Sequence, residues 1–371
     1  KALYYADINR YGKGASLRIK RFHYYFRKCQ TSKNPIDIIQ KMIKIPANIK
    51  FDKEKKEMFG NKNKVGVVIG VEGMMCPHCE ARVKKVVEAY GDIVSEYITI
   101  NEPNVYCTNS LFYGTWPPEK KSLSALVKAF SNMTACHVRA YEYIHQKRRE
   151  MGYDDTRVSF ANHLRIFAPK KEKNVIHKIC AKLTDWLFQG AITRAMMTGK
   201  CAFPVMRRKG VKKGKYYDFI GVNYYSRSTV SGIVDGVREG CYKNDLGWEI
   251  YHEGLIELAQ KLNKKYNAPI YVTENGTCDN YDKFRARFIY DQLKLVSETD
   301  NAIERYYHWS FTDNFEWKEG ESARFGIVHV DYETQKRTVK DSGIFYSSLI
   351  RNGGATKEAY ANYVEPTAYK R

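Results

Sequence analysis

Five short apolar segments separated by long stretches with helical periodicity constrain the fold most. Segments 123–149 and 248–266, for example, place apolar residues at three- and four-residue intervals, which predicts helices. Strands that alternate with helices pack side by side as a parallel sheet, either open or closed into a barrel. We therefore predict an α/β fold. The five predicted strands lie at residues 97–100, 158–161, 219–225, 270–273 and 305–311.

Each predicted strand is followed by polar or aromatic residues, and two strands are followed by glutamate. In a parallel barrel, the side chains at the carboxyl ends of the strands form the active site. Taken alone, Glu102 and Glu274 are each equally consistent with a turn residue that caps the next helix. Together they predict a carboxylate pair across a pocket, which is what glycoside hydrolysis requires. The strand ends read Asn101-Glu102, Asn162-His163, Asn223-Tyr224-Tyr225, Glu274-Asn275 and Trp309-Ser310.

Three motifs resemble glycoside hydrolase family 1, the β-glucosidase family. They are Asn101-Glu102-Pro103, Thr273-Glu274-Asn275-Gly276 and the run from Trp309 to Trp317, and the likeness covers roughly residues 80 to 350. The resemblance implies a (β/α)8 TIM barrel and retaining hydrolysis of β-linked glucosides or related sugars through a glycosyl-enzyme intermediate. It also implies that Glu102 is the acid/base and Glu274 the nucleophile.

The same resemblance assigns residues to the sugar. An indole face packs on the C–H face of a sugar ring, while a carboxylate accepts hydrogen bonds from its hydroxyl groups. For the tyrosine and the two tryptophans, the alternative interpretation is core packing. The substrate-binding candidates are Asn101 for the 2-hydroxyl, Asn223, Tyr225 beside the nucleophile, Trp309 under the ring, Glu316 for outer hydroxyls and Trp317 as a pocket wall.

The carboxylate pair has an expected distance and an expected protonation state. Retention requires carboxyl groups only about 5 to 5.5 Å apart. Carboxylates at that distance repel, so one of them keeps its proton near neutral pH. That proton is what the leaving group needs, and the resemblance gives the acid role to Glu102.

The front of the barrel is short. Only 100 residues precede Asn101, and they contain no Gln-x-Glu-Gly, Arg-Phe-Ser or His-Trp-Asp motif of the kind the family carries on its first three strands. Segment 65–71 fits the third strand, whereas the first two have no candidate. We therefore expect a TIM-barrel-like fold that is incomplete at its first two or three βα units, with weak or absent glycosidase activity. The alternative function is a non-catalytic sugar-binding or scaffold barrel.

We divide the chain into an atypical basic segment, residues 1–63, and a glycosidase-like barrel, residues 64–371. Within the barrel, residues 64–90 read as strand, loop and helix, and the loop resembles that of heavy-metal-associated domains. There, two thiolates at the spacing of Cys76 and Cys79 hold a soft ion such as Cu(I). Only half of such a domain is matched, so we prefer a structural interpretation, and we expect no cofactor.

Nearly half of the net charge of +21 lies at one end, because residues 1–50 hold 12 basic and 2 acidic side chains. Basic and aromatic residues together suit nucleic acid, but no nucleic-acid-binding motif accompanies them, so a solvated basic face is preferred. No apolar run approaches the ~18 residues of a membrane span. Nine scattered cysteines favour free thiols and a cytoplasmic location. The expected partner is a small-molecule β-glycoside or oligosaccharide.

Overall fold

A computed structural model describes residues 77–232 and 234–370. The basic segment 1–63, the predicted strand 65–71 and Cys76 lie outside the described residues. The division of the chain into these two parts therefore stays a prediction.

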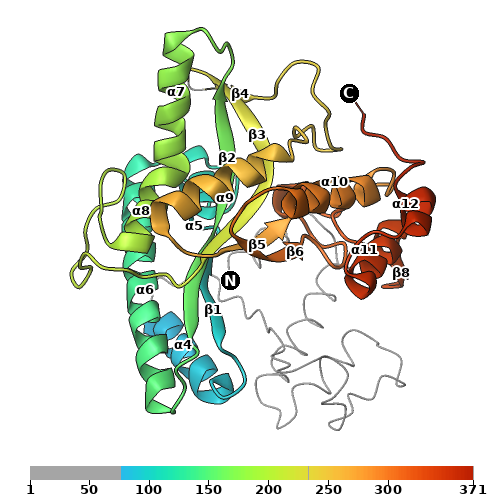
Figure 1. The fold of residues 1–371 in the computed structure, drawn as a ribbon. Helices are drawn as coiled ribbons and strands as arrows, with labels where there is room; N and C mark the ends of the chain where they lie inside the picture. The colour runs from blue at the N-terminus through green and yellow to red at the C-terminus, as the bar shows by residue number, and fades with distance from the viewer. Residues whose placement is uncertain (1–76, 233, 371) are drawn as a thin grey trace.

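Five parallel strands form the central sheet in the order β1-β2-β3-β5-β6 (Figure 1). A short strand, β4, pairs antiparallel with the end of β3. The five predicted strands are confirmed. Strand β2 runs further than 158–161 because its second half pairs with β3 as far as Pro169. The last strand ends at His308, and Phe311 lies in an exposed loop. The bounds are β1 (Glu96–Asn101), β2 (Arg157–Pro169), β3 (Ile220–Ser231), β4 (Val234–Gly236), β5 (Ile270–Asn275) and β6 (Ile303–His308).

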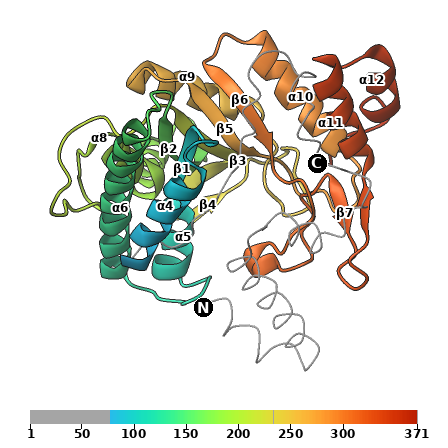
Figure 2. The ribbon, with the colours of Figure 1, turned by 90° about the horizontal axis from the view of Figure 1, so that it is seen from below.

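Helices lie around the outside of the curled sheet (Figure 2). The predicted helix 123–149 is confirmed as α6, which begins where the Ser122 side chain accepts a hydrogen bond from the Ala125 backbone N–H. The predicted helix 248–266 begins later, at Glu253, because the preceding residues pair with the segment before them: the Ile250 N–H donates to the Tyr242 carbonyl. Helix α6 packs against β1 and β2, and α9 packs against β2 and β3.

The remaining elements complete the part of the chain that the structure describes. They are α4 (Pro77–Tyr90), α5 (Pro103–Cys107), η1 (Thr108–Tyr113), α6 (Leu123–Glu150), α7 (Val175–Asp185), η2 (Trp186–Gly190), α8 (Ala191–Thr198), α9 (Glu253–Tyr266), α10 (Arg285–Glu298), η3 (Trp317–Glu319), β7 (Val328–Val330), β8 (Arg337–Val339), α11 (Asp341–Asn352) and α12 (Lys357–Tyr363).

The sheet is an open, curled half-barrel. Within residues 77–370, β1 and β6 each pair with one neighbour only, and β6 exposes Glu304, Arg305 and Tyr307. At the amino ends of the strands, Arg305 and the Tyr271 hydroxyl both donate to Glu96 on β1, at 2.8 and 3.0 Å. The curl thus brings β1 and β6, the two edge strands of this sheet, within side-chain reach of each other, which agrees with the expected incomplete barrel.

Candidate active site

The carboxyl ends of β1, β3 and β5 bring the two predicted glutamates to one place. Glu102 directly follows β1 and has a positive φ of 46°, a conformation that is uncommon outside glycine. Its N–H donates to the Ala161 carbonyl on β2 at 2.9 Å, which holds this turn in place. Glu274 lies on β5, opposite Asn223 of β3 in the sheet register. Both carboxyl groups therefore belong to the same end of the half-barrel.

Two asparagine amides connect the carboxyl groups. The Asn101 amide donates to Glu274 Oε1 at 3.0 Å. The Asn223 amide donates both to Asn101 Oδ1 and to Glu102 Oε1, each at 3.0 Å. The Thr273 hydroxyl donates to Asn223 Oδ1 at 2.5 Å, which fixes the orientation of that buried amide. The predicted pair Glu102 and Glu274 is thus part of one hydrogen-bond network.

Glu274 holds its proton more tightly than an ordinary glutamate does. Burial, and after it the neighbouring Glu102 charge, raise the pKa of Glu274 to about 8. The Tyr225 hydroxyl donates to Glu274 Oε2 at 2.6 Å, which partly offsets this rise. Burial and the nearby carboxylates raise the pKa of Tyr225 well above its usual value, so Tyr225 remains a hydrogen-bond donor.

Glu102 has the opposite shift. Burial raises the pKa of Glu102, but it is outweighed by the hydrogen bond from His163 and the charge that ring carries when protonated, by the hydrogen bond from Asn223 and by the positive charge of Arg165. The pKa of Glu102 therefore lies below its usual value. The pKa values of the two carboxyl groups are thus shifted in opposite directions, upward for Glu274 and downward for Glu102. The physical reason is the His163–Arg165 pair behind Glu102, which the motifs do not include. That Glu102 supplies the proton to the leaving group stays a prediction.

The segment after β6 supplies the predicted sugar-contacting residues. Glu316 accepts a hydrogen bond from the Asn314 amide at 3.2 Å and another from Trp309. Burial raises the pKa of Glu316. Trp317 is 39% exposed and stacks face to face on Trp116, with ring centroids 4.1 Å apart. Trp309 is partly buried and, like Tyr225, packs against the cluster formed by Cys278, Ala323 and Phe325. Its proposed contact with the sugar stays a prediction.

Three residues at the site were not among the predicted site residues. His163 stood among the strand-end residues, and its position at the carboxyl end of a strand was the signal that could have identified it. Arg165 follows two residues later on the same strand, at an irregularity in the pairing of β2 with β3, and its guanidinium reaches the His163 ring. Trp116 had no signal in the sequence, because its contact with Trp317 joins segments 200 residues apart.

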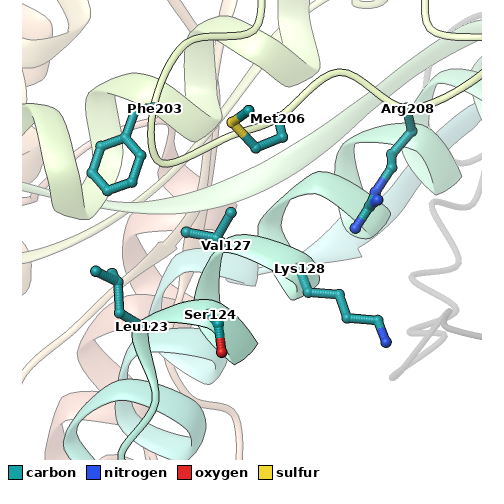
Figure 3. Close-up of a pocket in the computed structure, with 7 residues that line it drawn as sticks. All are labelled: Leu123, Ser124, Val127, Lys128, Phe203, Met206 and Arg208. Atoms are coloured by element: carbon teal, nitrogen blue, oxygen red, sulfur yellow. The ribbon is translucent and has the colours of Figure 1, made fainter.

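A second surface feature is a groove between the start of α6 and segment 203–208 (Figure 3). It contains two cationic side chains and no residue of the carboxylate network. Its lining residues are Leu123, Ser124, Val127, Lys128, Phe203, Met206 and Arg208.

The described residues contain no group of three His, Cys, Asp or Glu side chains that could hold a metal ion. Cys76 lies outside them, and Cys79 belongs to α4 without a described side chain. The metal-loop resemblance therefore stays a prediction. No described helix has both the length and the apolar composition needed to cross a membrane.

The family model for glycosyl hydrolase family 1 matches residues 79–355. The chain belongs to this family. Among curated family 1 relatives, β-glucosidase A of Thermotoga maritima is 30% identical over 297 residues, which is 72% of this chain and 66% of that protein. The β-galactosidase of Saccharolobus solfataricus is 32% identical over 305 residues, 75% of this chain and 59% of that protein. The chain thus spans about three fifths to two thirds of the length of these relatives.

Solved family 1 structures share the fold. The β-glycosidase from Pyrococcus horikoshii has a TM-score of 0.68 at 31% identity, over 77% of this chain and 67% of that one. The T. maritima β-glucosidase in complex with castanospermine has a TM-score of 0.64 at 28% identity, over 74% and 67% of the two chains. The half-barrel of this chain therefore corresponds to part of a family 1 TIM barrel.

Proposed function

We propose that this chain is a retaining β-glycosidase in which Glu274 is the nucleophile and Glu102 the acid/base. The observation that carries the proposal is the asparagine-linked network, which holds two carboxyl groups with opposite pKa shifts at one end of the sheet. Pairs of acids whose environments separate their pKa values are the usual basis for dividing acid and base roles.

The reaction proceeds in two steps. Glu274 attacks the anomeric carbon while the bond to the leaving oxygen breaks, and that oxygen takes the proton of Glu102. Water then attacks the glycosyl-enzyme bond, gives its proton to Glu102 and releases Glu274. Tyr225 and Asn101 donate to the Glu274 carboxylate and stabilise it as the leaving group of this second step.

The proposed substrate is a small β-glycoside. Relatives named β-glucosidase and β-galactosidase support a β-glucoside or β-galactoside. Trp309, Trp317 and Glu316 would contact the sugar ring and its outer hydroxyls, with Asn101 at the 2-hydroxyl. The proposal includes neither nucleic acid nor a cofactor. We place the protein in the cytoplasm, because its six cysteines with described side chains are free thiols, as expected in a reducing compartment.

We expect turnover by this chain to be slow. The described sheet ends at β1, and the contacts that the family makes from its first strands have no counterpart within residues 77–370. Interactions that strengthen in the transition state supply much of the rate, so their loss lowers kcat even where both glutamates are well placed.

The test combines turnover with covalent labelling. We expect the full chain to release the aryl group of an aryl β-glucoside, and a 2-deoxy-2-fluoro-β-glucoside to label Glu274, as located by mass spectrometry of a peptic digest. Glu274→Gln should abolish both signals. Glu304→Gln, which removes an exposed glutamate of β6, is the matched control and should retain them.

One result would instead support a non-catalytic sugar-binding barrel. In that case no aryl β-glycoside is turned over and no label is found. Glucose or an aryl glucoside then still changes the fluorescence of the site tryptophans in a saturable manner.

A further inference from the structure

We propose that His163 is a positioning residue for Glu102. Arg165 holds the His163 ring in the Nδ1-protonated form, and His163 then fixes Oε1 of Glu102 so that Oε2 of Glu102 delivers the proton. The delivery step rests on the proposed function. The arrangement of protons on His163 and Glu102 does not rest on it. His163 lies on β2, between the strands that lead to Glu102 and to Asn223.

The His163 ring is tightly held. It is buried, it stacks on the Tyr225 ring with centroids 5.7 Å apart and planes at 15°, and the edge of Phe188 meets it at 6.0 Å. Its Nδ1 lies 3.3 Å from Glu102 Oε1. This distance is slightly long for a hydrogen bond, as is common for catalytic contacts before substrate binds.

Arg165 determines which ring nitrogen of His163 carries hydrogen. Its Nη2 and Nε lie 3.1 and 3.3 Å from His163 Nε2. A guanidinium group only donates, so Nε2 must present its lone pair, and the single hydrogen of the neutral ring is on Nδ1. Arg165 is itself fixed, because Nη1 donates to the Ser228 hydroxyl at 3.1 Å and the guanidinium lies over the Phe188 ring.

A second proton on His163 is disfavoured. Burial lowers the pKa of His163 and the Arg165 charge lowers it further, which outweighs the opposite effect of Glu102. The other titratable group that contacts the ring is Tyr225 on β3, whose hydroxyl donates to Glu274 on β5. The neutral ring therefore acts on Glu102 as a hydrogen-bond donor and does not serve as an acid.

The two oxygens of Glu102 are used differently. Oε1 accepts from His163 Nδ1 and from the Asn223 amide. Among the described residues, no donor lies within hydrogen-bonding distance of Oε2. A carboxylic acid places its hydrogen on the oxygen that is not already accepting two hydrogen bonds. During glycosyl transfer, the Oε2–H bond breaks and the leaving oxygen, which keeps the electrons of its bond to the anomeric carbon, takes the proton.

The first experiment needs no turnover. In full-length protein labelled with 15N-histidine, we expect one histidine with hydrogen on Nδ1 and a bare Nε2 at pH 7, which His163→Asn identifies by its loss. Arg165→Met should release this fixed tautomer. Arg238→Met, an exposed arginine paired with Glu172, is the matched control and should leave it unchanged. An Nε2–H tautomer or a doubly protonated ring in the wild type would overturn the proposal.

The second experiment follows Glu102 itself. With 13C-labelled glutamate and Glu102→Gln for assignment, we expect the Glu102 titration to move up by about one pH unit in His163→Leu, because the carboxylate loses a donor. His163→Asn retains an amide donor and should restore most of the wild-type titration. An unchanged Glu102 titration in a folded His163→Leu variant would contradict the proposal.

The third experiment measures catalysis. For His163→Leu we expect kcat/KM to fall roughly 10- to 100-fold on an aryl β-glucoside with a poor leaving group and much less with an activated one. The alkaline limb of the pH profile should move to higher pH. An equal loss on both substrates with an unmoved profile would reduce His163 to a structural residue. If the wild type turns over nothing while the Glu102 titration behaves as expected, the proposed function fails and the positioning role stands.

Discussion

Glu102 and Glu274 face the same site, are both half-buried and each accept two hydrogen bonds, yet their pKa values move in opposite directions. Glu102 accepts from His163 and Asn223, and Glu274 from Tyr225 and Asn101. Neither burial nor the number of donors therefore separates them. The difference lies in the surrounding charges: those of His163 and Arg165 lower the pKa of Glu102, whereas those of Glu102 and Glu316 raise the pKa of Glu274.

Turnover requires the opposite order of pKa values. In the free protein the pKa of Glu274 is raised and that of Glu102 lowered, but the proposed reaction needs Glu274 ionised and Glu102 protonated. Positive charge develops at the anomeric carbon beside Glu274 and favours its ionised form. We therefore expect the proton to lie on Glu102, and Glu274 to be ionised, as the bond to the leaving oxygen begins to break.

Replacing Glu102 should have the largest effect on kcat/KM. For Glu102→Gln we expect kcat/KM to fall roughly 10²- to 10⁴-fold on aryl β-glucosides with poor leaving groups, because no acid protonates the departing oxygen. Activated leaving groups depart without a proton, so the loss should shrink along a series of substituted phenols. Glu96→Gln, at the other end of β1, is the control. An equal loss across the series would assign Glu102 another role.

Glu274→Gln should stabilise the protein at alkaline pH. The pKa of Glu274 is raised from its unfolded value to about 8, so stability is greatest below the unfolded pKa and is lost as the pH rises through 8. Gln carries no such cost. We expect the variant and the wild type to unfold alike near pH 4, and the variant to be more stable by on the order of 3 kcal/mol at pH 9.

Urea unfolding at pH 4, 7 and 9 measures this difference. Glu304→Gln is the control, because an exposed glutamate gives no pH-dependent gain. A constant difference between Glu274→Gln and the wild type at all three pH values would show that Glu274 is not held as the protonated acid.

Tyr225→Phe should increase the difference between the pKa values of Glu274 and Glu102. Glu274 loses its Oε2 donor, so its pKa rises and its carboxylate becomes a poorer leaving group in the second step. A hydrogen bond to a charged group contributes about 1.5 to 3 kcal/mol, so we expect kcat to fall roughly 10- to 100-fold. Tyr224→Phe is the matched control, because that hydroxyl donates to the Tyr251 carbonyl outside the network. Equal kinetics for the two variants would contradict the role of Tyr225.

The pH dependence of kcat/KM in the wild type follows the titration of the Glu102 and Glu274 pair. Above about pH 8 the last proton leaves Glu274 and Glu102, and no acid remains for the leaving group. We expect kcat/KM to fall about tenfold per pH unit there, with the limb assigned to the pair as a whole. The measurement is kcat/KM of an aryl β-glucoside with a poor leaving group from pH 5 to 10. A profile that stays flat to pH 10 would contradict the raised pKa of Glu274.

The sequence was sufficient for the parts of the molecule that local patterns determine. The strands and the glutamates after β1 and β5 follow from apolar runs and the residues that end them. The directions of the two pKa shifts could not be predicted from the motifs, because they depend on the register of β1 and β2, which sets His163 beside Glu102, and on Arg165, which contacts that ring. The length of β2 was missed because only its pairing with β3 reveals it.

Replacing Glu316 should have the smallest effect on the pKa values of Glu102 and Glu274. Its charge adds to those that raise the pKa of Glu274, so Glu316→Gln should move the alkaline limb to lower pH by less than about one unit. Glu316 is also proposed to bind the sugar, but a loss of affinity lowers the whole kcat/KM profile without moving its limb. Glu319→Gln removes an equal but more exposed charge three residues away and should leave the limb in place. If both variants move the limb equally, the pair responds to the overall charge of this loop, and the contrast between Glu102 and Glu274 owes nothing to Glu316 in particular.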